Sequence, residues 1–158
     1  RLLLTLLWET GARPSEVAHL TAGDIDFANR VAILREHKTD HSGRPRLVVL
    51  SPVAAELLRA QALKHRDGGP LVRNTRGGAW TKDKVVLAVR TTGKRAGVKI
   101  TAYGYRHTFA TNALEKGLPD AHVAALLGHS STAMLHKHYS HLTANTGALR
   151  TALEKVRG

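Results

Sequence analysis

The sequence predicts one mainly α-helical domain that carries a small three-stranded antiparallel β-sheet. Segments bounded by helix-starting and helix-ending residues cover most of the 158 residues, and three short strand-like runs lie between residues 25 and 50. The length fits a single domain with a sizeable core. Apolar residues make up 42% of the chain, a content that argues against disorder.

The first two predicted helices are separated by a glycine. Residues 1–10 form an apolar segment that ends at Gly11, which indicates a buried helix. Pro14 begins a second, short helix, because proline suits the first turn. The apolar run over residues 2–8 is too short to cross a bilayer, so no membrane partner is expected.

The predicted sheet follows these helices. Residues 25–27 and 30–34 indicate two strands joined by the turn at Ala28 and Asn29. A polar turn over residues 39–45 leads to a third strand over residues 46–50.

The rest of the chain is predicted to be helical. Pro52 begins one helix, Thr81 is a plausible N-cap for the next, and Gly117 and Gly128 end two others. The predicted helices span residues 52–65, 81–95, 105–116, 120–127, 132–139 and 142–156.

The charge of the chain predicts a polyanionic partner. Lys and Arg number 24 against 12 Asp and Glu, which gives a net charge of +12. Residues 1–29 have a net charge of −2, whereas residues 64–99 have a net charge of +8. Such a concentrated surplus suits a groove that follows phosphates. The predicted DNA-contacting residues are Arg44, Arg73, Arg76, Lys82, Lys84 and His107.

The chain contains no cysteine, which excludes disulfides and thiolate metal sites. Four histidines close together in sequence leave a metal site as an alternative, and two of them, His138 and His141, can share a helical face. No carboxylate lies close to them in sequence, and solvated histidines are common, so we expect no metal and no cofactor. The four are His129, His136, His138 and His141.

Two basic residues lie where they could reach a phosphate. Arg13 lies between the first two helices, where its planar fork could bind a phosphate with Glu16 orienting it. The alternative is an ordinary ion pair at a helix end. Lys38 lies where a strand enters a turn and could reach a DNA groove from a hairpin tip. The alternative is a solvated turn lysine.

Two further segments could present groups to an anion. Arg106 is predicted to lie in the first turn of a helix, whose positive dipole end would also favour a phosphate. The helix end at Gly128 would let His129 point at a ligand. Tyr139 follows ten residues later.

Four segments in order resemble the signature segments of the tyrosine recombinase (phage integrase) family. They are residues 10–17, 106–111, 126–130 and 139–142, and the Lys-bearing hairpin falls between the first and the second. The resemblance covers nearly the whole chain and implies the catalytic-domain fold of that family. It also implies strand cleavage and rejoining through a covalent 3′-phosphotyrosine, without a metal or high-energy cofactor.

The resemblance implies a role for each matching residue. Arg13 and Arg106 resemble the two arginines that hold the scissile phosphate, His129 the histidine that contacts it, and Tyr139 the nucleophile. Lys38 resembles the lysine that protonates the leaving 5′ oxygen. Two supporting residues, Glu16 and Tyr103, complete the predicted site.

One position departs from the family pattern. The family usually has a histidine three residues before the second arginine, where this chain has Tyr103. A phenol can donate a hydrogen bond to a phosphate, but it is a poor proton shuttle near neutral pH. We therefore expect a supporting role for Tyr103.

The resemblance also sets the expected context of the chain. Residues 1–158 would be one catalytic domain, a fragment without an N-terminal DNA-clamping domain. Its partner would be double-stranded DNA, and the protein would lie in the cytoplasm. Copies of the protein would associate on that DNA into a tetrameric synapse. The alternative function is a DNA-binding module of the same fold with weakened catalysis.

Overall fold

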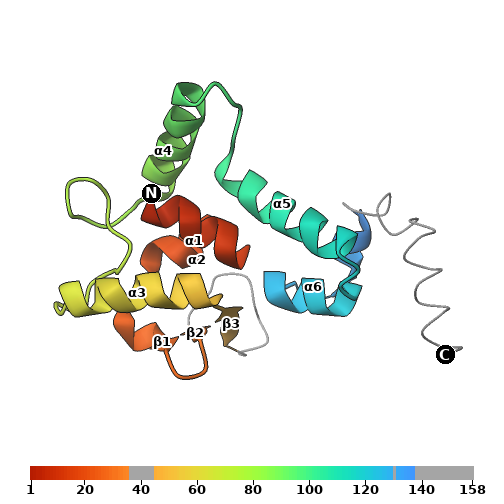
Figure 1. The fold of residues 1–158 in the computed structure, drawn as a ribbon, viewed down its shortest axis with the longest axis horizontal. Helices are drawn as coiled ribbons and strands as arrows, with labels where there is room; N and C mark the ends of the chain where they lie inside the picture. The colour runs from red at the N-terminus through yellow and green to blue at the C-terminus, as the bar shows by residue number, and fades with distance from the viewer. Residues whose placement is uncertain (36–44, 130, 138–158) are drawn as a thin grey trace, which may run out of the picture.

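The computed structural model describes residues 1–35, 45–129 and 131–137. Within these residues it is mainly helical with one three-stranded antiparallel sheet, which confirms the predicted fold class (Figure 1). The elements are α1 (Leu2–Thr10), α2 (Pro14–His19), a 3-10 turn (Ala22–Asp24), β1 (Ile25–Asp26), β2 (Val31–Leu34), β3 (Arg46–Val49), α3 (Pro52–Lys64), α4 (Lys82–Arg95), α5 (Ala102–Glu115) and α6 (Asp120–Leu127).

The sheet is small and has the order β1-β2-β3, with both neighbouring pairs antiparallel. Leu34 pairs with Arg46, so β3 begins directly opposite the end of β2. Along β3 the side chains alternate: Arg46 and Val48 are buried, whereas Leu47 and Val49 are about half exposed. A charged residue therefore lies on the buried face of this strand.

The hydrophobic core has two parts. The larger part gathers α1, α2, the sheet, α3 and α4 around fully buried side chains such as Leu7, Val48 and Leu58. The smaller part lies between α5 and α6, around Val123 and Leu127. Helix α5 packs against both α1 and α6, so it joins the two parts (Figure 1).

Hydroxyl side chains begin three of the helices. The Oγ atoms of Ser51 and Thr81 accept hydrogen bonds from the backbone N–H groups of Ala54 (3.1 Å) and Lys84 (3.3 Å). Thr101 caps α5 in the same way, at 2.9 Å from the Gly104 nitrogen. Because of this cap, α5 begins at Ala102, three residues earlier than predicted.

The early start of α5 corrects the predicted place of Arg106. Arg106 is the fifth residue of the helix and lies beyond the first turn, so the prediction of a first-turn arginine was wrong. Its side chain is buried, at 9% exposure. The exposed residue of the first turn is Tyr103.

Gly128 ends α6 as predicted. It adopts the left-handed conformation at φ +67°, and its N–H donates to the Ala125 carbonyl at 3.0 Å. The His129 N–H donates to the Ala124 carbonyl at 2.9 Å, which completes a reversal of the chain at the helix end.

Parts of the predicted secondary structure lie outside the described residues. These are the hairpin tip between β2 and β3, the end of the helix predicted over 132–139, and the helix predicted over 142–156. Residues 133–137 are helical, in agreement with the start of the former. Among the described helices, none has the length and apolar content needed to cross a membrane.

Candidate active site

Glu16 fixes the side chain of Arg13. One carboxylate oxygen of Glu16, Oε2, accepts the backbone N–H of Arg13 at 2.8 Å, and the other, Oε1, accepts its Nη1 at 2.7 Å. The predicted orientation of Arg13 by Glu16 is therefore present as a contact. The Arg13 side chain is 25% exposed, so part of its fork faces solvent.

Arg106 ties α5 to two other segments. Its Nη1 donates to the Gly11 carbonyl at 3.0 Å, and its Nη2 donates to the Leu127 carbonyl at 2.6 Å. Gly11 has φ +60°, and a Cβ atom there would lie 2.6 Å from the Phe109 ring, one turn further along α5. The close approach of α1 to α5 that brings Arg106 to Gly11 therefore requires glycine at this position.

A third arginine, Arg46, enters the same site from the sheet, and the sequence did not indicate it. It is 6% exposed, and its Nη1 and Nη2 donate to the carbonyls of Ala125 (3.1 Å) and Leu126 (2.7 Å). Nη1 also donates to the Leu47 carbonyl. In a strand, alternate residues share a face, so Arg46 lies on the same face as Val48. The sequence does not show which face is buried, because Leu47 and Val49 on the other face are as apolar as Val48.

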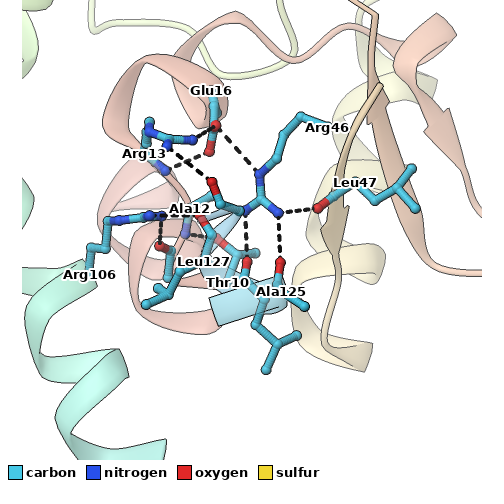
Figure 2. A network of polar contacts seen from close by, with 12 residues as sticks. Thr10, Ala12, Arg13, Glu16, Arg46, Leu47, Arg106, Ala125 and Leu127 are labelled. Carbon is cyan, nitrogen blue, oxygen red and sulfur yellow. Dashed lines mark hydrogen bonds and ion pairs between the residues drawn. The ribbon is translucent and has the colours of Figure 1, made fainter. Parts of the chain in front are cut away.

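The carboxyl end of α6 is the point where the three arginines meet. Arg13 Nη2 donates to the Gly128 carbonyl at 3.3 Å, next along the chain from the carbonyls bound by Arg106 and Arg46. Figure 2 shows Arg106 directed at Leu127 and Arg46 at Ala125. The last carbonyls of a helix have no partner within the helix and form the negative end of its dipole. Three guanidiniums supply those partners, and they bring Arg13, Arg46 and Arg106 together.

Burial affects the charge of Arg46. Removal from water lowers the pKa of the Arg46 guanidinium, the Glu16 carboxylate raises it, and the nearby Arg13 lowers it again. Arg46 nevertheless stays a cation, because a guanidinium does not lose its proton in proteins. Its Nε lies 3.6 Å from Glu16 Oε1, an ion-pair distance longer than a hydrogen bond.

His129 follows directly from this helix end. The reversal at Gly128 places its backbone immediately after the carbonyl that Arg13 binds and two residues after the one that Arg106 binds. The side chain of His129 is partly buried.

Tyr103 lies on the exposed side of the first turn of α5, at 60% exposure. It lines a pocket between α2, α4 and α5 together with Ser15, His19 and Lys82. The hydrogen bonds that join the three arginines run to Glu16 and to backbone carbonyls, and not to Tyr103. The structure thus puts Tyr103 beside Lys82, a residue of the predicted DNA-contacting set.

Among the described residues of the predicted DNA-contacting set, all but Arg73 are exposed. Arg76, Lys82, Lys84 and His107 are exposed. Arg73 is only 19% exposed at its side chain, where its Nη2 pairs with Asp67 at 2.5 Å and its Nε donates to the Pro70 carbonyl. The hydrogen bond from Arg73 lowers the pKa of the Asp67 carboxyl.

Three predicted residues, Lys38, Arg44 and Tyr139, lie outside the described residues. So do two of the four histidines of the alternative metal site. His136 Nε2 lies 3.5 Å from Asp120 Oδ2, a carboxylate distant in sequence. Over residues 1–35, 45–129 and 131–137, no three His, Cys, Asp or Glu side chains cluster in a way that could hold a metal ion.

A mainly helical domain with a three-stranded antiparallel sheet has the architecture of tyrosine recombinase catalytic domains. The chain belongs to the phage integrase family, whose family model matches residues 1–146. It is 29% identical to the tyrosine recombinase XerA of Pyrococcus horikoshii over 99% of this chain and 54% of the relative. It is 33% identical to the tyrosine recombinase XerD of Corynebacterium glutamicum over 92% of this chain and 49% of the relative.

Solved structures show the same fold. A crystal structure of XerA recombinase has a TM-score of 0.73 and 26% identity, over 99% of this chain and 57% of that one. A pre-cleavage complex of XerH recombinase with its difH substrate has a TM-score of 0.70 and 25% identity, over 86% of this chain and 41% of that one. The chain spans about half the length of the curated relatives that it matches.

Proposed function

We propose that this chain is the catalytic domain of a site-specific DNA recombinase that breaks and rejoins strands through a covalent 3′-phosphotyrosine at Tyr139. The observation that carries the proposal is that Arg13 and Arg106 meet at the end of α6, directly before His129, in a member of the phage integrase family. The proposed chemistry needs no metal and no high-energy cofactor, because the phosphotyrosine bond stores the energy of the broken phosphodiester.

The two arginines would act on the non-bridging oxygens of the scissile phosphate. In the transition state these oxygens gain negative charge, and fixed guanidiniums stabilise that charge without reorganising. Arg13 is already held by Glu16, and Arg106 by two backbone carbonyls. Groups fixed in this way meet the requirement for electrostatic stabilisation of a transition state.

The remaining roles concern bond making and proton transfer. The phenol oxygen of Tyr139 would bond to phosphorus and lose its proton to solvent, while the bond from phosphorus to the 5′ oxygen breaks. Lys38 would protonate the departing 5′ oxygen, and His129 would donate a hydrogen bond to the phosphate. Tyr103 would donate a hydrogen bond where relatives have a histidine.

The proposed partner is double-stranded DNA. The XerH structure holds that recombinase on its difH substrate, and this chain has a net charge of +12. Because the chain covers about half of its relatives, we propose that it works with an N-terminal DNA-clamping domain and self-associates on DNA, in the cytoplasm.

The proposal is tested by recovering the DNA that becomes covalently attached to the protein from a library of random sequences. The sequences of the recovered DNA identify the target site. The protein is incubated with supercoiled plasmids that carry a random-sequence insert, denatured with detergent, and the DNA that stays attached is sequenced. We expect attached DNA enriched in one sequence, and none with Tyr139→Phe, whose DNA affinity should be unchanged because a single hydroxyl contributes little to a large electrostatic interface.

Tyr105→Phe is the matched control, since the chain has three tyrosines and this one packs against the core. An adduct that persists in Tyr139→Phe would move the nucleophile to Tyr103 or Tyr105. DNA binding by the wild-type protein without any adduct would favour the DNA-binding module of weakened catalysis.

A further inference from the structure

Arg46 has no role in the chemistry proposed above, although it is one of the four buried polar or charged residues of the described chain. Moving a charged group from water to a protein interior carries a large free-energy cost, even after the surrounding protein has relaxed. An apolar residue at the start of β3 would avoid that cost and could pack beside Val48 on the same buried face. The contacts of Arg46 therefore need an explanation.

The first set of contacts lies at the end of α6. Arg46 donates to the carbonyls of Ala125 and Leu126, while Arg106 and Arg13 bind the next two, those of Leu127 and Gly128. Four successive carbonyls are thus held by three guanidiniums. Arg46 holds the two that precede the turn into His129, so it fixes the direction in which the chain leaves the helix.

The second contact lies at Glu16. Oε1 of Glu16 accepts Arg13 Nη1 at 2.7 Å and lies 3.6 Å from Arg46 Nε (Figure 2). Arg46 therefore faces the same carboxylate oxygen that orients the partly exposed fork of Arg13. With Arg46 absent, Glu16 would keep one cation and gain freedom to rotate.

The third contact shows how closely the fork is seated. A Cβ atom built on Gly128 would lie 2.5 Å from Cζ and 2.7 Å from Cδ of Arg46. The guanidinium thus rests directly on the backbone of the residue that turns the chain toward His129. A larger residue at position 128 would be disfavoured both by the φ of +67° and by this contact.

We propose that Arg46 is a positioning residue that aligns Arg13, through Glu16, and His129, through the end of α6, for attack on the scissile phosphate. This inference rests on the proposed function. Arg46 would touch neither substrate nor reacting atoms. The planar fork is needed because it reaches two carbonyls and a carboxylate at once, which a lysine ammonium cannot do from one position.

The test compares Arg46→Lys and Arg46→Met with the control Arg59→Lys. Arg59 lies on α3 outside the site, where it covers the Phe27 ring at 5.4 Å. The probe is the duplex recovered by covalent capture, at saturating concentration and well below the unfolding temperature. The measured quantities are the single-turnover rate of adduct formation, the DNA affinity and the folded fraction.

We expect Arg46→Lys to slow adduct formation by about 100-fold, the scale of a misplacement of about 1 Å in an active site. DNA affinity and folded fraction should match those of Arg59→Lys. Arg46→Met should be at least as slow per folded molecule. Rates that stay at the wild-type value, or that fall only in proportion to the folded fraction, would overturn the proposal.

A second measurement separates this inference from the proposed function. Nitrogen-15 relaxation of the Nε–H groups reports how rigidly each arginine is held, with no need for DNA or cleavage. In Arg46→Lys the order parameter of Arg13 should fall, whereas that of Arg106, which is held by Gly11 and Leu127, should stay. An unchanged Arg13 would overturn the inference. If the wild type forms no adduct, the proposed function fails and this measurement alone decides the inference.

Discussion

Replacing Gly128 with alanine should destabilise the protein far more than the same change at Gly117. The two glycines end neighbouring helices with the same pattern of hydrogen bonds: Gly117 donates to Leu114 at 2.9 Å, and Gly128 to Ala125 at 3.0 Å. Both have positive φ, +76° and +67°. They differ in their surroundings, because a Cβ on Gly117 would meet nothing within 4 Å, whereas one on Gly128 would overlap the Arg46 guanidinium.

The magnitude follows from this difference. A left-handed alanine costs about 1–2 kcal/mol, and Gly117→Ala should lose that amount. Gly128→Ala should lose the same amount and also displace Arg46 from at least one of its carbonyl partners. A hydrogen bond from a charged group contributes about 1.5–3 kcal/mol, so the total for Gly128→Ala should be about 2.5–5 kcal/mol.

Urea unfolding at 25 °C measures both losses, read from the midpoints at an unchanged slope. Equal losses at the two positions would show that Arg46 does not rest on Gly128, and the reasoning would fail. A double-mutant cycle with Arg46→Ala refines the result. Gly128→Ala should be less harmful once the guanidinium is gone.

Three further predictions concern the proposed chemistry. Arg13→Lys and Arg106→Lys should each lower the cleavage rate by about 100-fold, because an ammonium does not reproduce a bidentate fork; full activity in either variant would contradict the phosphate contact. Lys38→Ala should be inactive on ordinary DNA and regain activity on a substrate with a bridging 5′ sulfur, which leaves without a proton; equal impairment on both would assign the proton to another residue. Arg76→Ala should reduce the slope of log affinity against log salt by about one. Arg73→Ala should reduce it less, because Arg73 is paired with Asp67; the reverse order would place the DNA path elsewhere.

Local chemistry made most of the fold predictable. Pro14 and the Thr81 hydroxyl begin helices, Gly11 and Gly128 end them, and each does so through backbone conformation or a cap within a few residues. The largest difference between a predicted and an observed boundary among the described elements was of the same local kind. Thr101 caps α5, which therefore begins three residues before the predicted start, and this moved Arg106 out of the first turn.

The sequence by itself determined the order of the site residues and the pairing of Arg13 with Glu16, since these lie one helical turn apart and their contact is local. Only the tertiary structure decided that Arg46 belongs with them. A strand shows which residues share a face, but the packing of the sheet on the rest of the molecule decides which face is buried. In β3 that packing exposed Leu47 and buried Arg46, against the ordinary preference of both side chains, because the carbonyls at the end of α6 that Arg46 binds lie on that side.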